Sequence, residues 1–357
     1  MKKHNYSAGP CILPQEVFKQ ASDALLNFDN LDLSLIEISH RSKNFVSVMD
    51  NAVQLVKDIL GVPSGYSVLF LQGGASLQFC MIPYNMMKVN AGKASYLVTG
   101  TWASNAQKEA SLFGESHTVA SSKDQNFNYI PKGFTVPSDS DYFHCTSNNT
   151  IFGTQMKAFP EVGVPTICDM SSDIFSRKID VSKFDMIYAG AQKNMGPAGT
   201  TLVIIKDELL GKSGRAIPSM LDYQTHIAKD SMYNTPPVFA IYVSMLTLEW
   251  LKKSGGIEWM EEVNNKKAGL LYSEIDRNPL FKGTTATEDR SNMNGCFLLN
   301  DESGAEAFDA LWKSAGIVGI NGHRSVGGYR ASMYNALTAE SVQTLVDVMR
   351  EFERTKG

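Results

Sequence analysis

The pattern of apolar and polar residues in the first part of the chain predicts helices packed on a sheet. Apolar side chains recur at helical spacing through residues 45–60, and Gly61 and Pro63 follow as stop signals. Residues 67–71 then form a short apolar run, which the glycine turn 72–76 joins to another apolar stretch. This order predicts an amphipathic helix followed by a strand, a glycine turn and a second helix.

Further apolar runs predict more strands of the same sheet. They lie at residues 96–98, 142–144, 164–168, 186–188 and 202–205. Several of these runs are separated by enough residues for a crossover helix, which parallel strands require. We therefore expect an α/β fold with a mostly parallel, buried sheet.

The pattern changes near residue 238, where a long helix is predicted to continue to roughly residue 260 before a polar stretch. A smaller α+β unit follows, with Thr338 as the N-cap of the final helix. Its other expected elements are a strand at 295–299, a helix at 304–315 and a glycine-rich stretch at 322–328. We therefore expect a large domain of residues 16–260 and a small domain of residues 261–357 together with residues 1–15.

Composition narrows the classes of function. The 357 residues carry a formal net charge of −4 and contain no long run of Lys or Arg, so nucleic acid is not an expected partner. No apolar stretch has the length of a membrane helix, and a membrane partner is not expected either. The five cysteines are scattered without a C-x-x-C pair, which favours a reduced, cytoplasmic compartment and no metal site.

Two polar residues follow predicted strands at positions suited to cofactor chemistry. Asp169 ends the run 164–168, and open α/β sheets place ligands at the carboxyl edge of their strands. Lys193 follows the run 186–188 among small residues. Pyridoxal phosphate needs an amine for its Schiff base and an anion that keeps its ring nitrogen protonated. Each residue alone would more often be a helix cap or a surface lysine, so the hypothesis depends on the pair.

The glycine turn adds a candidate phosphate site. Gly73 and Gly74 precede Ala75 and Ser76 where the second helix is predicted to begin, and the free N–H groups of a helix N-terminus bind anions. A glycine pair after a strand is also ordinary turn chemistry, and this turn lacks the G-x-G-x-x-G pattern of dinucleotide-binding folds. Together with Asp169 and Lys193, the turn favours pyridoxal 5′-phosphate as a single ligand.

Six short motifs resemble those of the phosphoserine aminotransferase family and follow the family's order along nearly the whole chain. They are residues 5–10 (NYSAGP), 38–43 (ISHRSK), 72–79 (QGGASLQF), 191–194 (AQKN), 233–237 (YNTPP) and 327–332 (GGYRAS). The resemblance implies a class V, fold-type I aminotransferase that uses pyridoxal phosphate. It further implies a mostly parallel seven-stranded sheet between helices, a small C-terminal α+β domain, and a homodimer with shared active sites.

The resemblance also implies a role for each matching residue. Lys193 would form the Schiff base and shuttle the proton, while Asp169 would hold the pyridine nitrogen. Trp102 would stack on the pyridine ring, although on sequence alone it could equally be a buried core tryptophan. The other cofactor-binding residues that the family implies are Ala75, Ser76, Thr150, Gln192, Asn234 and Thr235, the last two from the other subunit.

The implied substrates are anionic and call for cationic side chains. Arg41 would bind the α-carboxylate, and the phosphate or second carboxylate would fall to His40, His323, Arg324 and Arg330. The implied reaction transfers the amino group of L-glutamate to 3-phosphohydroxypyruvate, giving O-phospho-L-serine and 2-oxoglutarate in serine biosynthesis. A phosphorylated hydroxythreonine of vitamin B6 synthesis, 4-phosphohydroxy-L-threonine, is an expected secondary substrate.

The chain departs from the family pattern at two places. Many bacterial members have an arginine in the phosphate turn, where this chain has Ala75 and Ser76, so an arginine contact is lost and the Ser76 hydroxyl is its expected replacement. Ala8 stands where some members have a second serine, which leaves only a backbone contact there.

Other functions remain as alternatives at this point. A serine–glyoxylate or alanine–glyoxylate aminotransferase would share Asp169 and Lys193 but would not need two His-Arg pairs. A cysteine desulfurase would need a mobile catalytic cysteine, whereas Cys296 lies in an apolar, strand-like segment. A nicotinamide dehydrogenase would need the glycine fingerprint, and a phosphoprotein-binding module would not need Asp169 with Lys193.

Overall fold

The computed structural model describes residues 3–356. Its helices are α1 (Gln15–Leu26), α2 (Lys43–Leu60), α3 (Gly74–Met86), α4 (Thr101–Ala110), α5 (Tyr223–Ile227), α6 (Val238–Lys253), α7 (Gly256–Arg277), α8 (Ala305–Ser314) and α9 (Ala339–Lys356). The strands up to residue 155 are β1 (His4–Asn5), β2 (Tyr66–Leu71), β3 (Lys93–Val98), β4 (Glu115–Ser121), β5 (Tyr142–Thr146), β6 (Asn148–Asn149) and β7 (Thr154–Gln155). The later strands are β8 (Thr166–Asp169), β9 (Met186–Gly190), β10 (Thr201–Lys206), β11 (Phe281–Gly283), β12 (Asn294–Leu299), β13 (Ile317–Val318) and β14 (Tyr329–Ser332).

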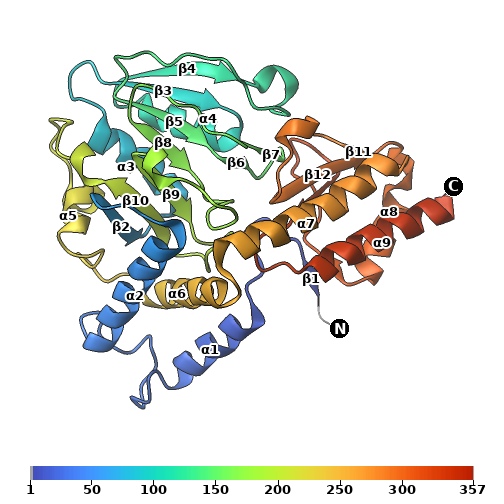
Figure 1. The fold of residues 1–357 in the computed structure, drawn as a ribbon, viewed down its shortest axis with the longest axis horizontal. Helices are drawn as coiled ribbons and strands as arrows, with labels where there is room; N and C mark the ends of the chain where they lie inside the picture. The colour runs from blue at the N-terminus through green and yellow to red at the C-terminus, as the bar shows by residue number, and fades with distance from the viewer. Residues whose placement is uncertain (1–2, 357) are drawn as a thin grey trace.

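A seven-stranded sheet in the order β2-β10-β9-β8-β5-β3-β4 forms the centre of the larger lobe (Figure 1). The neighbours from β9 to β4 pair in parallel, while β10 is antiparallel to both β2 and β9. The expectation of a mostly parallel sheet in an α/β fold is therefore confirmed. Because β2 and β9 are both antiparallel to β10, they run in the same direction as the other strands.

The strands are apolar along their length because both faces of the sheet are covered. On one face, Leu97, Phe143 and Ile187 join the core formed with α2 and α6. On the other face, Tyr96 and Tyr188 join the core under α3 and α4. Strands covered on both faces appear in a sequence as continuous apolar runs. This is why the inner strands could be predicted from sequence.

Helix α2 forms as its sequence predicts. Ser42 accepts a hydrogen bond from the N–H of Phe45 as N-cap, and Gly61 ends the helix in the left-handed conformation with φ 61°. Six apolar side chains of α2 are buried, and each of them apart from Ala52 stabilises the fold by roughly 1.5–3 kcal/mol relative to exposure. They are Phe45, Val48, Met49, Ala52, Val56 and Leu60.

The smaller lobe contains the antiparallel sheet β11-β12-β14, covered by α7, α8 and α9 (Figure 1). Its core is separate from the two cores of the large sheet and includes Phe297, Phe308 and Tyr329. The N-terminal segment also belongs to this lobe, since β1 pairs in parallel with β13 and Tyr6 is buried in its core. The capping role expected of Thr338 is present, because its hydroxyl accepts from the N–H of Ser341.

The prediction of one helix from 238 to roughly 260 is wrong. Helix α6 ends at Lys253, and Gly255, with φ 124°, separates it from α7. Helix α7 then continues through the polar stretch after residue 260, because its buried face includes the polar side chains Asn264 and Lys267. The proposed domains, 16–260 and 261–357 with 1–15, stay a prediction. The separate core of the small lobe supports them, although residue 260 lies inside α7.

In the described part of the chain, every helix falls short of the length and apolar character that a bilayer crossing requires.

Candidate active site

The carboxyl edge of the large sheet brings the candidate residues to one side. Strands β2, β3, β5, β8 and β9 run in the same direction, so their C-terminal ends share this edge. The glycine turn, Trp102, Thr150, Asp169 and Lys193 all lie at the end of one of these strands or shortly after it. Ligands of open α/β sheets bind at this edge.

Asp169 is the last residue of β8 and is buried. Its Oδ1 accepts hydrogen bonds from the backbone N–H of Ser171 at 2.9 Å and from the Ser171 hydroxyl at 2.6 Å. Burial raises the pKa of this carboxyl, while the Ser171 hydroxyl and the charge of Lys193 act in the opposite direction. The carboxylate is therefore fixed in orientation and shielded from water.

Lys193 lies in the loop between β9 and β10, and its Nζ donates to the Thr150 hydroxyl at 2.8 Å. The loop is held at its start, because the carbonyl of Ala191 accepts from both Met195 and Gly196. Burial lowers the pKa of the Lys193 amine, and Asp169 opposes this shift. Lys193 is thus a fixed amine whose proton is more easily lost than that of a surface lysine.

Trp102 stands in the first turn of α4, and its ring centroid lies 5.6 Å from Lys193 Nζ. Its indole Nε1 is buried and has no hydrogen-bond partner among residues 3–356. A buried donor without a partner is costly, so this one is a candidate contact for a ligand.

Thr150 connects Lys193 to the small lobe. It follows β6 directly, and its carbonyl accepts from Arg330 Nη1 at 3.2 Å. Arg330 comes from β14, and its Nε is also buried without a partner in the described part of the chain. Burial lowers the pKa of the His323 imidazole, and the charges of Arg330 and Arg324 add to this effect. His323, Arg324 and Arg330 therefore lie close enough to interact, with two guanidinium charges around an imidazole that burial keeps neutral, and Arg330 contacts Thr150.

The glycine turn begins α3 in the way a phosphate site requires. Gly73 and Gly74 have φ values of 87° and 65°, and a side chain at Gly73 would collide with Leu77. Ala75 and Ser76 then occupy the first turn of α3. The free N–H groups of this turn lie at the same sheet edge as Lys193.

The side chains and backbone groups at this edge fit pyridoxal 5′-phosphate, which needs an amine, an anion, an aromatic face and phosphate donors. The amine of Lys193 and the carboxylate of Asp169 meet the needs of the aldehyde and the ring nitrogen. Trp102 supplies an aromatic face, and the α3 N-terminus supplies phosphate donors. Gln192 precedes Lys193 in the same loop.

Other predicted residues lie elsewhere in this chain. Thr235 contacts Gln72, whose Nε2 donates to its carbonyl at 2.9 Å, and Asn234 lines a small cavity near the same turn. His40 has a buried Nε2 without a partner among the described residues, and Arg41 is exposed. The hydrogen bonds of residues 3–356 do not join any of these four residues to Lys193, Asp169 or Trp102.

Two residues around the site were missed by the sequence analysis. The thiol of Cys11 donates to the backbone carbonyl of Lys193, and a side chain at Gly9 would lie 3.4 Å from Cγ of the same lysine. The 5–10 motif was the available signal for this contact. Asp173 lies four positions after Asp169 and binds the segment that carries Thr150. A single carboxylate in a serine-rich loop gave no signal for it.

The chain matches known proteins over almost its whole length. The family model described as Aminotransferase class-V matches residues 4–345. A phosphoserine aminotransferase of Flavobacterium psychrophilum is 69% identical over 354 residues, which cover 99% of each chain. The protein of the same name from Bacteroides fragilis is 57% identical over 356 residues, 99% of each chain.

Solved structures agree with this match. The phosphoserine aminotransferase of Bacillus circulans subsp. alkalophilus superposes with a TM-score of 0.96 at 44% identity, covering 100% of this chain and 99% of that one. The PLP-bound enzyme of Trichomonas vaginalis gives a TM-score of 0.92 at 35% identity, covering 98% of this chain and 100% of that one. This chain therefore belongs to the class-V aminotransferase family.

Proposed function

We propose that the protein is a phosphoserine aminotransferase, which transfers the amino group of L-glutamate to 3-phosphohydroxypyruvate and releases O-phospho-L-serine and 2-oxoglutarate. The relatives of this name, at 54–69% identity over the full length, support the proposal. The observation that carries it is a cluster of Arg330, Arg324 and the His323 imidazole, whose Arg330 contacts Thr150 beside Lys193. A doubly anionic substrate needs such a cluster.

The cofactor of this reaction is pyridoxal 5′-phosphate, whose ring withdraws electrons from the substrate Cα while that carbon is deprotonated. Lys193 Nζ would hold the cofactor covalently and, when the amino donor frees it, would carry the proton to and from the substrate Cα. Burial favours the neutral form of its amine, which is the form that accepts a proton. Asp169 holds the ring nitrogen in its protonated form, and Ser171 keeps the carboxylate aimed.

The remaining cofactor contacts are assigned by position. Trp102 stacks on the pyridine ring, and the backbone of Ala75 and Ser76 binds the phosphate at the start of α3, together with Gln192. Thr150 orients the amine of Lys193 through their hydrogen bond.

The substrate contacts come from two segments. Arg330 and the His323-Arg324 pair bind the phosphate or the distal carboxylate, because two guanidinium groups and an imidazole hydrogen-bond donor lie together and Arg330 reaches Thr150. Arg41 binds the α-carboxylate, and His40 assists with the second anion. A guanidinium can bind a carboxylate or phosphate through two parallel hydrogen bonds, which fixes the substrate's orientation.

We propose a homodimer that shares its active sites. Asn234 and Thr235 match the family's residues that reach the cofactor phosphate of the other subunit, and we assign them to the partner's site on that ground. The segment before His40 exposes apolar side chains that a second copy would cover, namely Leu25, Leu26, Leu31, Leu33 and Ile36.

Serine biosynthesis in the cytoplasm is the proposed setting, with 4-phosphohydroxy-L-threonine as a secondary substrate of the same chemistry. The cysteines are all free thiols, in keeping with a reduced compartment. An alanine–glyoxylate aminotransferase from Nostoc sp. shares the fold at 13% identity, which carries no argument about substrate.

The proposal is tested by measuring O-phosphoserine formed from glutamate and 3-phosphohydroxypyruvate by the purified protein. Pyruvate and glyoxylate serve as control acceptors, and Lys193→Ala serves as the inactive control. Turnover of the phosphorylated acceptor alone, lost in Lys193→Ala, is the expected result. A preference for pyruvate or glyoxylate would leave the cofactor assignment intact and refute the roles of His40, His323, Arg324 and Arg330.

A further inference from the structure

Thr150 is carried by a short hairpin whose base determines its position. Strands β6 and β7 pair antiparallel, with Asn148 opposite Gln155 and Asn149 opposite Thr154. Thr150 directly follows β6, so it lies at the far end of this hairpin from Ser147. A hairpin of two residue pairs is not stable by itself, so contacts at its base must determine where its tip and Thr150 lie.

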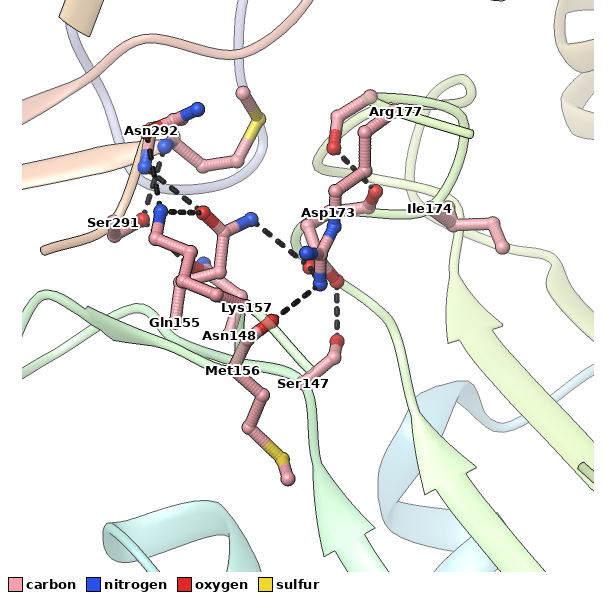
Figure 2. A network of polar contacts seen from close by, with 12 residues as sticks. Ser147, Asn148, Gln155, Met156, Lys157, Asp173, Ile174, Arg177, Ser291 and Asn292 are labelled. Atoms are coloured by element: carbon pink, nitrogen blue, oxygen red, sulfur yellow. Dashed lines mark hydrogen bonds and ion pairs between the residues drawn. The ribbon is translucent and has the colours of Figure 1, made fainter. Parts of the chain in front are cut away.

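The carboxylate of Asp173 holds both strands of this hairpin (Figure 2). The Ser147 hydroxyl donates to Oδ1 of Asp173, and Gln155 Nε2 donates to Oδ2 at 3.1 Å. Ser147 also binds Asp169 directly, because its backbone N–H donates to the Asp169 carbonyl at 3.0 Å. Asp173 therefore ties the residue that ends β8 to the hairpin that carries Thr150.

Arg177 provides the countercharge for this buried carboxylate. Its Nη2 lies 3.4 Å from Oδ2 of Asp173 and donates to the carbonyl of Met156 at 2.7 Å (Figure 2). The guanidinium also lies over the ring of Phe159, 5.4 Å from its centroid. A buried carboxylate without a paired cation would strongly destabilise the fold, and the ion pair with Arg177 offsets this cost for Asp173.

The charge of Asp173 also reaches the reactive amine. Burial lowers the pKa of Lys193, and the titratable groups that act on it come from four segments. Asp169 on β8, Asp173 in the following loop and Cys11 in the N-terminal segment oppose the shift, whereas Arg330 on β14 adds to it. Removing the charge of Asp173 should therefore lower the pKa of the amine further.

We propose that Asp173 is a positioning residue of the transamination, which holds the Ser147–Gln155 hairpin so that Thr150 meets Lys193. The inference rests on the proposed function, because it assumes that Lys193 carries the cofactor and moves the proton. Asp173 itself does not touch the substrate and acts through Thr150.

The test uses the full-length enzyme loaded with pyridoxal phosphate and the variant Asp173→Asn, which keeps the size of the side chain. The pH titration of the bound cofactor's visible absorption should shift downward by about half a pH unit. The value of kcat should fall about tenfold, with KM for glutamate changed less than about twofold. Asp173→Glu, which keeps the carboxylate, should bring both the titration midpoint and kcat most of the way back to the wild-type values. Asp180→Asn, which removes an exposed capping carboxylate, is the matched control and should resemble the wild type.

A double-mutant cycle separates positioning from a general loss of packing. If Asp173 acts through Thr150, Asp173→Asn should lower kcat less than about twofold in a Thr150→Val background. An undiminished tenfold loss in that background would overturn the proposal, as would a wild-type titration midpoint and kcat in Asp173→Asn alone.

Two milder variants cover the case in which Asp173→Asn does not fold. Ser147→Ala and Gln155→Met each remove one of the two hydrogen bonds from the hairpin to the Asp173 carboxylate, and each should lower kcat by about threefold. The two variants lose different second contacts, Ser147 that to the Asp169 carbonyl and Gln155 those to Lys157 and Asn292, so their shared effect reports on Asp173. Unchanged kcat in both would overturn the proposal. If the wild type itself forms no lysine-bound absorption band, the proposed function fails, and this outcome is distinct from any result with Asp173.

Discussion

The amine of Lys193 lies 2.8 Å from the hydroxyl oxygen of Thr150, which stands 43 positions earlier in the chain. This contact joins the loop after β9 to the hairpin after β5. It also lies beside Arg330, which donates to the Thr150 carbonyl from the small lobe. The contact therefore links the proposed site of cofactor attachment to the proposed site of substrate charge.

Thr150→Val should lower kcat/KM about tenfold while leaving the affinity for pyridoxal phosphate nearly unchanged. Valine keeps the shape but removes the hydroxyl, and a hydrogen bond to a charged or reactive group contributes about 1.5 kcal/mol. Steady-state kinetics and a cofactor titration check the two parts. The exposed Thr118→Val on β4 is the control. Equal kinetics for the two variants would remove Thr150 from the mechanism.

Trp102→Ala should weaken cofactor binding, raising its dissociation constant roughly 30-fold, whereas Trp102→Phe should change it less than about fivefold. The reason is that an aromatic face is kept in one variant and lost in the other. Fluorescence titration of the cofactor-free protein provides the measurement. If alanine and phenylalanine bound the cofactor equally well, Trp102 would be a core residue rather than a ring partner.

Arg330→Met should reduce kcat/KM for 3-phosphohydroxypyruvate by about 100-fold and leave kcat/KM for pyruvate at its original low level. The loss corresponds to the roughly 2–3 kcal/mol of a charge-assisted hydrogen-bond pair, which 3-phosphohydroxypyruvate can form and pyruvate cannot. Arg354→Met on α9, where the arginine pairs with Glu351 at the surface, is the control. A parallel loss for both acceptors would indicate instead that Arg330 supports Thr150.

Lys267 should make the stability of the protein depend on pH. Burial lowers its pKa to about 7, and its Nζ donates only to backbone carbonyls, those of Met333 and Tyr334. Below that pH, both folded and unfolded chains hold the proton, and the folded state bears the full cost of a buried charge. Between about 7 and the ordinary lysine value of about 10.4, only the unfolded chain holds it, so the free energy of unfolding rises with pH.

Urea unfolding of the cofactor-free protein between pH 6.5 and 9 should therefore show a rise of up to about 1.4 kcal/mol per pH unit from this one residue. Lys267→Met should flatten the curve, while Lys266→Met, at the exposed neighbouring position, should keep it. An identical rise in all three proteins would show that other groups control it.

The sheet could be predicted from the sequence where its strands are buried. Inner strands such as β5 and β9 are apolar because helices cover both faces. The edge strand β4, Glu115–Ser121, was not predicted, because its half-exposed residues include Glu115, Ser116 and Thr118. The break between α6 and α7 was missed although Gly255 and Gly256 marked it, because the apolar pattern around them was given more weight.

The site could be predicted only in part. Asp169 and Lys193 follow strands that pair directly, so their shared edge was accessible to sequence reasoning. Thr150 depended on the family resemblance, because nothing local distinguishes it from another loop threonine. Asp173 and Cys11 became visible only in the fold, since their contacts join segments that are distant in the sequence.

The pairing of β1 with β13 fixes when the site can be completed during synthesis. His4 and Asn5 must wait for Ile317 and Val318, so the N-terminal segment has no strand partner until most of the chain has left the ribosome. The thiol of Cys11 reaches the Lys193 carbonyl from that same segment. Domains generally fold as units, and the large lobe can form earlier. A nascent chain would therefore have the sheet of its large lobe in place before the N-terminal segment encloses Lys193.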